Sequence, residues 1–222
     1  MTALLRYQAA LLLRSQRWLP PVLLYGIFLA VGAQGGDPVL DSLGYAAAAL
    51  LPVAAWLVRI CVNQEPAAAR DCAAAATSPR RAHLASLGVA VGSAALLGCA
   101  GTLVITLVSS PTDTSHQVAV PVLRAGLAGL LALFVCALTG AAAGAVLTRP
   151  VLHGRGWSVA ATSLAALLLL VTRGSPARSA VYGLVDGSHS GTVHTPVLAL
   201  FVAVLAAAGA GAAVSVQAAR RG

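Results

Sequence analysis

The chain has 222 residues, of which 59 % are hydrophobic and only 9 % are charged, and its mean hydropathy is +0.87. These values are too apolar for a water-soluble domain of this size, so the composition excludes such a domain and predicts an all-α integral membrane protein. The formal net charge of +8 comes from arginine, because the chain contains no lysine. The arginines are dispersed among apolar segments, which indicates membrane topology and contact with membrane lipid, and no nucleic-acid partner.

The pattern of residues 1–17 predicts an amphipathic helix that lies in the membrane interface. At roughly 100° per residue, Arg6, Arg14 and Arg17 fall within about 80° of one another, and most leucines of the segment lie opposite. Such a helix buries its apolar side among acyl chains and keeps its arginines with the headgroups. Trp18 is expected at headgroup depth, and the prolines that follow it direct the chain into the first span.

Six apolar stretches are candidates to cross a hydrocarbon core about 30 Å thick. They lie approximately at residues 19–34, 43–62, 84–108, 125–147, 157–172 and 196–216. The first and the fifth are short, so they require local thinning of the bilayer or help from flanking residues. Gly140 and Gly144 in the fourth stretch are spaced for close helix packing, although this spacing also arises by chance in a chain rich in Ala and Gly. The predicted fold is one transmembrane domain over residues 1–222, a six-helix bundle preceded by the interfacial helix.

An even number of spans places both termini on one side of the membrane, and arginine identifies that side. The segments on the side of the termini contain Arg6, Arg14, Arg17, Arg59, Arg70, Arg80, Arg81, Arg149, Arg155, Arg220 and Arg221. The other side has only Arg124, Arg173 and Arg178. The positive-inside rule therefore predicts a multi-pass protein with both termini in the cytoplasm. Heavy use of Ala and Arg without Lys is typical of a GC-rich bacterium, so we expect a bacterial cell membrane.

The sequence lacks the motifs of membrane enzymes and of ATPases. A P-loop requires a lysine that the chain does not have, and no Gly-x-Ser-x-Gly sequence occurs. The four cysteines lack the spacing of a metal or redox site, and we interpret them as packing residues. Asp186, His189 and His194 could gather a metal on the outer face, but such spacing is common in a polar loop. We predict no catalytic residue, no metal and no cofactor on this chain, which is expected to be a non-enzyme.

The segment between the second and third stretches, residues 64–79, has the most distinctive sequence. Pro66 suits the first position of a helix, Arg70 and a run of alanines favour its interior, and Pro79 is expected to stop it after about 12 residues. A helix of about 18 Å is too short to cross a membrane, but it is rigid and flanked by charge. On these residues alone it is either a simple connector or a lever between a soluble partner and the bundle.

The topology and this segment together resemble the permease subunits of type-2 ABC exporters. In that family the segment commonly reads as an acidic residue, Gly-Thr, a leucine-rich helix, and then Pro with Ser and Arg before the third span. The residues that match this pattern are Glu65, Thr77, Ser78, Pro79, Arg80 and Arg81. The sequence departs from it in two respects, since Ala-Ala-Ala-Arg replaces the Gly-Thr step and the helix is rich in alanine.

The resemblance implies that residues 65–77 form a coupling helix that docks on a separate nucleotide-binding subunit. The residues implied in coupling are Glu65, Arg70, Asp71, Thr77, Ser78, Pro79, Arg80 and Arg81. ATP and Mg²⁺ would be bound by the partner ATPase, and a second permease chain, identical or similar, would complete the transporter. The implied function is export of a hydrophobic or amphipathic compound, such as a drug, a peptide or a lipid. The alternative is an anchor or accessory subunit of a larger membrane complex that transports nothing.

Residues 173–195 form the longest expected segment on the outer side. They contain an apolar island at residues 180–185 between flanks rich in Gly and Ser. The segment is either an ordinary surface loop that rests on the bilayer or a re-entrant segment. In the exporters that the chain resembles, this stretch often forms short re-entrant helices that close an outer gate, and the resemblance implies Tyr182 as a gate residue.

Overall fold

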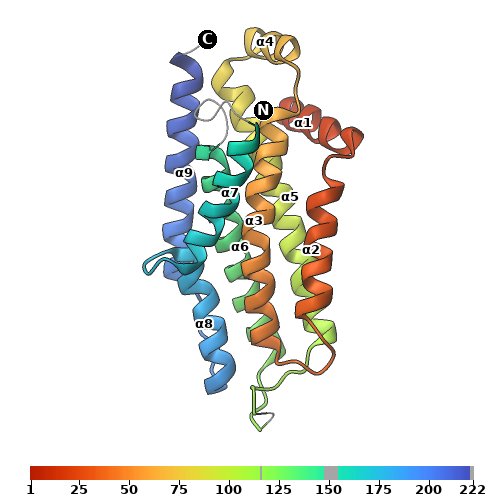
Figure 1. The fold of residues 1–222 in the computed structure, drawn as a ribbon, viewed down its shortest axis with the longest axis vertical. Coiled ribbons are helices and arrows are strands. Elements are labelled where there is room, and N and C mark those ends of the chain that lie inside the picture. The colour runs from red at the N-terminus through yellow and green to blue at the C-terminus, as the bar shows by residue number, and fades with distance from the viewer. Residues whose placement is uncertain (116, 148–154, 221–222) are drawn as a thin grey trace.

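The computed structural model describes residues 1–115, 117–147 and 155–220, which form an all-helical bundle (Figure 1). The helices are α1 (Thr2–Ser15), α2 (Leu19–Gly32), α3 (Val39–Asn63), α4 (Ala67–Ala76), α5 (Pro79–Val108), α6 (Val122–Leu147), α7 (Arg155–Val171), α8 (Pro176–Ser190) and α9 (Val197–Arg220). Within the described residues, four helices are long and apolar enough to cross a membrane, namely α3, α5, α6 and α9. This composition is that of a multi-pass membrane protein. The apolar helix α2 and the apolar part of α7, residues 161–171, are shorter.

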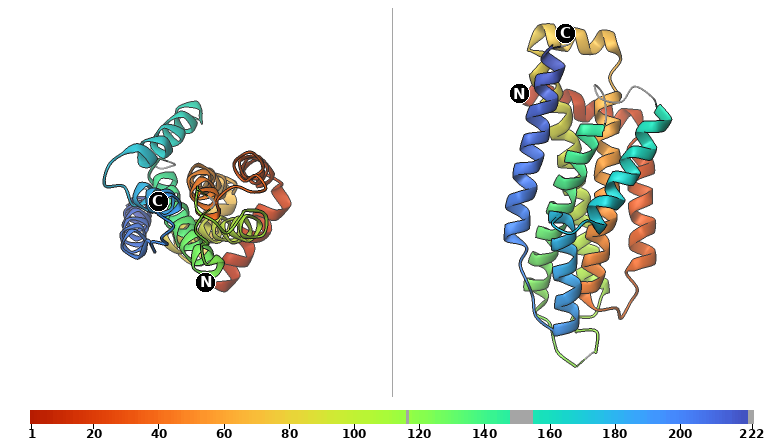
Figure 2. Two further views of the ribbon diagram at one scale, coloured as in Figure 1. Left: turned by 90° about the horizontal axis from the view of Figure 1, so that it is seen from below. Right: turned by 60° about the vertical axis from the view of Figure 1, so that its left-hand side comes forward.

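The central helix of the bundle is α3, which packs against α2, α5, α6, α7 and α8. Of the most apolar 18 residues in each helix, 56 % are buried within the chain in α3 and in α6, against 28 % in α5 and 22 % in α9. The helices α3 and α6 therefore form the interior, while α5 and α9 present most of their apolar side chains to the surroundings. Figure 2 shows this arrangement from the end of the bundle and from the side.

Glycines of α6 allow that helix to lie directly against α3. A Cβ atom at Gly140 would overlap the carbonyl oxygen of Leu51, and one at Gly144 would lie 2.7 Å from the carbonyl oxygen of Ala55. Only glycine permits such a close approach of two helix backbones. The Gly140 and Gly144 pair therefore marks a true helix contact, and that contact lies within this chain.

At one end of the bundle lie α1, α4 and both termini, and this end is called the α4 end below (Figure 1). The predicted amphipathic helix is present as α1, which packs on α5. Its arginines Arg6 and Arg14 are exposed, whereas Gln8 and Leu12 are buried. Part of the inward side of α1 therefore contacts protein. The chain then turns at Gln16, and α2 begins with prolines in its first turn, as the sequence predicts.

The structure shows a helix, α8, in the segment for which the sequence leaves open a surface loop or a re-entrant segment. From the α4 end, α7 reaches partway along the bundle, and α8 continues from there to the far end (Figure 2). The two helices are separated by a short break in which Gly174 has a φ of +93°. Leu184 and Val185 of α8 pack against Gly44 of α3, and this contact fixes the position of α8 along the length of the bundle. The helices α7 and α8 together thus run from the α4 end to the far end, where the sequence predicts a single short span at residues 157–172.

Candidate functional site

The candidate coupling helix α4 stands beyond the ends of α3 and α5 (Figure 1). It has 10 residues, or about 15 Å, and is slightly shorter than the sequence predicts. At its end the Thr77 hydroxyl donates to the carbonyl of Ala73 at 2.8 Å. Pro79 does not terminate α4 directly, because it is the first residue of α5, and the Ser78 hydroxyl caps that helix by accepting from the Arg81 backbone N–H at 3.3 Å. Only two residues therefore separate α4 from the 30-residue helix α5.

Most of the described side chains implied in coupling are accessible. Thr77, Pro79, Arg80 and Arg81 are exposed, and Ser78 is half-buried. The helix α4 also contains Arg70 and Asp71, whose side chains lie outside the described part of the structure. The first turn of α5 thus offers two guanidinium groups to a partner at the α4 end.

Glu65 differs from these residues, because it is buried against α1. Its side chain is only 7 % exposed, and its Oε2 accepts a hydrogen bond from Gln8 Nε2 at 3.0 Å. The neighbouring Gln64 donates through its Nε2 to Gln8 Oε1 at 2.9 Å and to the Gln8 carbonyl at 3.3 Å. Loss of water and the nearby Glu65 carboxylate, which also accepts a hydrogen bond, raise the pKa of the Tyr7 hydroxyl.

These contacts join α1 to the connection between α3 and α4. Gln8 is 1 % exposed, and sequence reasoning missed its role. A signal was present, because Gln8 lies among the leucines on the apolar side of the amphipathic helix, where a polar side chain needs a partner. A charge reversal at Glu65 would consequently disturb the attachment of α1 as well as any partner surface.

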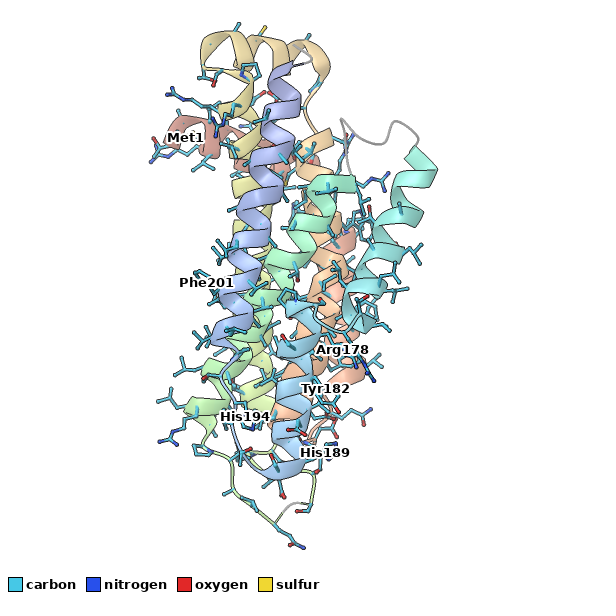
Figure 3. All side chains as sticks on the ribbon, turned by 90° about the vertical axis from the view of Figure 1, so that its left-hand side faces the viewer. Met1, Arg178, Tyr182, His189, His194 and Phe201 are labelled. Carbon is cyan, nitrogen blue, oxygen red and sulfur yellow. The ribbon has the colours of Figure 1, made fainter. Side chains whose placement is uncertain are left out.

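The second feature is a polar row on the outward side of α8. Tyr182 is 63 % exposed, Asp186 and His189 are exposed, and Arg178 is half-buried. Spacings of four, four and three residues place these side chains on one helix face. Figure 3 shows Arg178, Tyr182 and His189 following one another along α8. The guanidinium of Arg178 donates to the Val171 carbonyl at 2.7 Å and so satisfies the end of α7.

This row contrasts with the outward faces of the other peripheral helices. Exposed large side chains on α2, α5 and α9 are apolar, and they include Leu23, Ile27, Leu96, Leu103, Leu198, Phe201 and Leu205. Because α8 lies beside the outer part of α3, a candidate span, its polar face is poorly suited to hydrocarbon. Tyr182 points away from the interior of this chain, so a gate that includes Tyr182 would have to form against another surface.

Within the described residues, no three metal-ligating side chains come together. The two histidines considered above instead lie beside hydroxyl groups. His189 Nδ1 is 3.3 Å from Thr114 Oγ1, and His194 Nε2 is 3.1 Å from Thr192 Oγ1. The first contact joins the α5–α6 connection to α8, and the second lies within the α8–α9 connection.

No family model, curated protein or solved structure matches the chain.

Proposed function

We propose that the chain is the permease subunit of an ATP-driven exporter of the ABC type, in which α4 docks on a separate ATPase subunit. The observation that carries the proposal is the placement of α4. A short helix is held outside the bundle between two long apolar helices, by three residues on one side and by two on the other. A passive connector between antiparallel helices needs only a few residues, whereas a helix with short, fixed ends can receive and transmit a displacement.

The transmission follows from the connections of α4. Because Ser78 caps α5 directly after α4, a push on α4 displaces the start of α5. The Gln8–Glu65 hydrogen bond extends the same displacement to α1. In turn α5 packs on α3 and α6, so the movement enters the interior of the bundle. ATP and Mg²⁺ belong to the partner in this proposal, and the cargo is a hydrophobic or amphipathic compound.

The polar row of α8 supports pairing of this chain with a second permease chain. Six crossings, with α7 and α8 together counted as one, would place Arg178, Tyr182 and Asp186 within the width of the membrane. Polar side chains at that depth are typical of a water-filled path or of a protein contact. Pairing of two permeases would cover this face and leave the apolar faces of α5 and α9 to lipid. Tyr182 then becomes a gate residue between two chains.

The arginine distribution supports a cytoplasmic α4 end. Arg6, Arg14, Arg80 and Arg81 lie on helices at that end, and Arg124 lies in the first turn of α6 at the other. Arg149, which the sequence also assigns to the cytoplasmic side, lies outside the described residues. Arg173 and Arg178 lie near the α7–α8 break and not beyond the far end. The excess of arginine at the α4 end over the far end is therefore maintained.

The test is purification of the tagged full chain from its native host in a gentle detergent, followed by quantitative mass spectrometry of the proteins that accompany it. The proposal predicts an ATPase with a P-loop at about one copy per permease. A stable complex with other membrane proteins and without a nucleotide-binding chain would contradict it and would favour the anchor or accessory function.

A matched pair of variants makes the test specific to α4. Ala75→Trp places a large side chain on the exposed surface of α4, and it should lower recovery of the ATPase. Ala100→Trp introduces the same side chain at an exposed position of α5, away from α4, and recovery should be unchanged. Equal recovery of the ATPase with both variants would place its docking surface elsewhere.

A further inference from the structure

The break between α7 and α8 lies at the level of the middle of the long helix α3. The helices α3 and α8 run in opposite directions, because Leu184 lies against Gly44 and Gly187 lies beside Leu40. Extending this register at about 1.5 Å per residue places Arg178 beside the middle of α3, a candidate span of 25 residues. If the membrane is centred on α3, Arg178 lies roughly 15 Å from either edge of the hydrocarbon core.

Arg178 has hydrogen-bond donors that no group of the chain uses. Its side chain is half-buried, and its Nη1 donates to the Val171 carbonyl at 2.7 Å, which is the only polar contact of that side chain among the described residues. A guanidinium has several further N–H donors. Arg173, within the same break, is exposed. The acidic residues lie toward the two ends of the bundle, with Asp37, Asp41, Asp113 and Asp186 toward the far end and Glu65 and Asp71 toward the α4 end. A charged side chain at membrane depth is typically paired or functional, and here the chain supplies no carboxylate.

The start of α8 adds neutral donors beside Arg178. Ser175 precedes the helix and is 7 % exposed, and its Oγ neither caps α8 nor has another hydrogen-bond partner in the described structure. Pro176 has no N–H group, and the first N–H to bond within the helix is that of Ser179, to the Ser175 carbonyl at 3.1 Å. The backbone N–H groups of Ala177 and Arg178 therefore have no partner within α8. A buried hydroxyl and two amides thus lie at the positive end of a helix dipole, an arrangement that favours an anion.

Apolar surface leads to the break along α7. Leu167, Leu168 and Val171, in the last turns of that helix, are exposed by 62 %, 55 % and 70 %. A hydrocarbon chain can lie against these residues while a polar group attached to it reaches Arg178. The phosphate of an ordinary bilayer lipid stays at the headgroup level, roughly 15 Å away, and an arginine side chain does not span that distance. The break therefore suits an anionic group that is carried into the bundle.

We propose that the α7–α8 break binds the anionic group of an amphiphilic cargo, a phosphate, sulfate or carboxylate on a hydrocarbon chain. Arg178 donates charge-assisted hydrogen bonds to this group, and the first turn of α8 supplies the neutral donors. In other transporters, too, the start of a half-helix near the midplane of the membrane receives anionic groups of the substrate. This inference rests on the proposed exporter function and narrows its cargo to an anionic amphiphile.

Binding to the purified full chain tests the inference without the ATPase. The tagged chain in phosphatidylcholine nanodiscs is held on scintillation beads, and tritiated dodecyl phosphate is the probe. Unlabelled dodecyl phosphate is compared as a competitor with dodecanol, which has the same chain and no charge. We expect half-maximal displacement at about a ten-fold lower membrane fraction of dodecyl phosphate, from charge-assisted hydrogen bonds to one guanidinium. Equal displacement, or no displaceable binding, would overturn the proposal, and neither comparison needs a variant to fold.

Variants and a bilayer lipid make the test specific to the break. Arg178→Gln should abolish the preference for dodecyl phosphate, and Arg178→Lys, which keeps the charge, should retain most of it. The matched control is Arg124→Gln, which removes an exposed arginine in the first turn of α6 and should leave the preference intact. A preference that survives Arg178→Gln would overturn the proposal, by showing general attraction to a basic protein. Displacement by phosphatidylglycerol as effective as by dodecyl phosphate would also overturn it, because the site would then hold a lipid of the bilayer.

The failure of this inference can be told apart from the failure of the proposed function. Recovery of an ATPase with the chain, together with equal displacement by dodecyl phosphate and dodecanol, would reject the anionic cargo and leave the exporter. Absence of any ATPase from the purified complex would reject the exporter itself, and with it the description of the bound amphiphile as cargo.

Discussion

Gln8 shows how a single polar side chain decides the position of a helix. It lies on the apolar side of α1, and its amide joins that helix to Glu65 and Gln64. The sequence predicts the amphipathic helix correctly, but it cannot predict this contact, because the partners are 57 and 56 residues away along the chain. The same contact explains why Glu65 is buried although it belongs to a segment that the sequence predicts to face a partner.

Removal of the Gln8 amide should loosen α1. In Gln8→Leu the buried Glu65 carboxylate loses a donor, at a cost of about 1–3 kcal/mol. We expect faster hydrogen exchange over residues 2–15, measured by mass spectrometry in detergent. Gln117→Leu is the control, because Gln117 is exposed at the far end of the bundle. Unchanged exchange of α1 in Gln8→Leu would show that the hydrogen bond does not hold the helix.

Asp113 gives the far end of the bundle a pH dependence. Its carboxylate accepts hydrogen bonds from the Ser115 hydroxyl and from the backbone N–H groups of Gln117, at 2.9 Å, and Val118, at 3.1 Å. These bonds, that from Ser115 foremost, lower the pKa of Asp113 below its ordinary value of 3.8. A carboxyl with a lowered folded-state pKa stabilises the fold above its unfolded-state pKa, and this contribution is lost as the pH falls through the folded-state pKa.

The corresponding measurement compares thermal unfolding of the unchanged chain and of Asp113→Asn across pH. The unchanged chain should unfold at the higher temperature near neutral pH. The gap between the two should close as the pH falls below 3.8, where the Asp113 carboxyl becomes protonated. A gap that persists unchanged in acid would mean that the charge of Asp113 contributes nothing to the stability.

At the scale of helices, apolar length is the property that the sequence predicts best. Each of the six apolar stretches overlaps a helix, and four of those helices qualify as spans by length and composition. For the segment of α8 the sequence left a surface loop and a re-entrant segment open, because its Gly, Ser and charged residues are typical of a loop whereas residues 180–185 are largely apolar. Its helical period was nevertheless present in the spacing of Arg178, Tyr182, Asp186 and His189. The apolar partners of its other face, Leu40 and Gly44, lie on α3 and could not be identified from local sequence.

The close packing of α6 on α3 predicts a large difference between two glycine substitutions. In Gly140→Ala the added methyl group overlaps the Leu51 carbonyl, so the helices must separate, at a cost of about 1–3 kcal/mol. Gly209→Ala is the control, because nothing lies within 4 Å of the added methyl group there. After heating in detergent, Gly140→Ala should leave less monodisperse protein than the unchanged chain, and Gly209→Ala should not. Equal losses would contradict the packing account.

At the scale of the whole molecule, the proposed orientation in the membrane rests on the difference between the two ends of the bundle. The α4 end contains both termini, α1 and α4, while the far end contains connections between helices, among them the long α5–α6 connection over residues 109–121 (Figure 1). The even number of predicted spans placed both termini on one side, and Figure 1 shows both at the α4 end. The cytoplasmic assignment of the α4 end rests on the positive-inside rule.

Cys72 allows this orientation to be measured. It is exposed on α4, whereas Cys61 and Cys136 are buried. In a Cys99→Ala background, a membrane-impermeant maleimide should label Cys72 in inverted vesicles and not in intact cells. In the background Cys72→Ser and Cys99→Ala, a cysteine introduced by Gln117→Cys should show the reverse pattern. Labelling of Cys72 from outside intact cells would invert the topology and remove α4 from the reach of a cytoplasmic ATPase.

The role of α4 is tested most directly by a cross-link from Cys72 itself. A photoreactive maleimide is attached to Cys72 in Cys99→Ala membranes from the native host, and the cross-linked chain is identified by mass spectrometry after illumination. The account predicts a cross-link to an ATPase subunit with a P-loop, weakened by Ala75→Trp and unaffected by Ala100→Trp. A cross-link to a protein without a nucleotide-binding site, or to lipid alone, would contradict the assignment of α4 as a coupling helix.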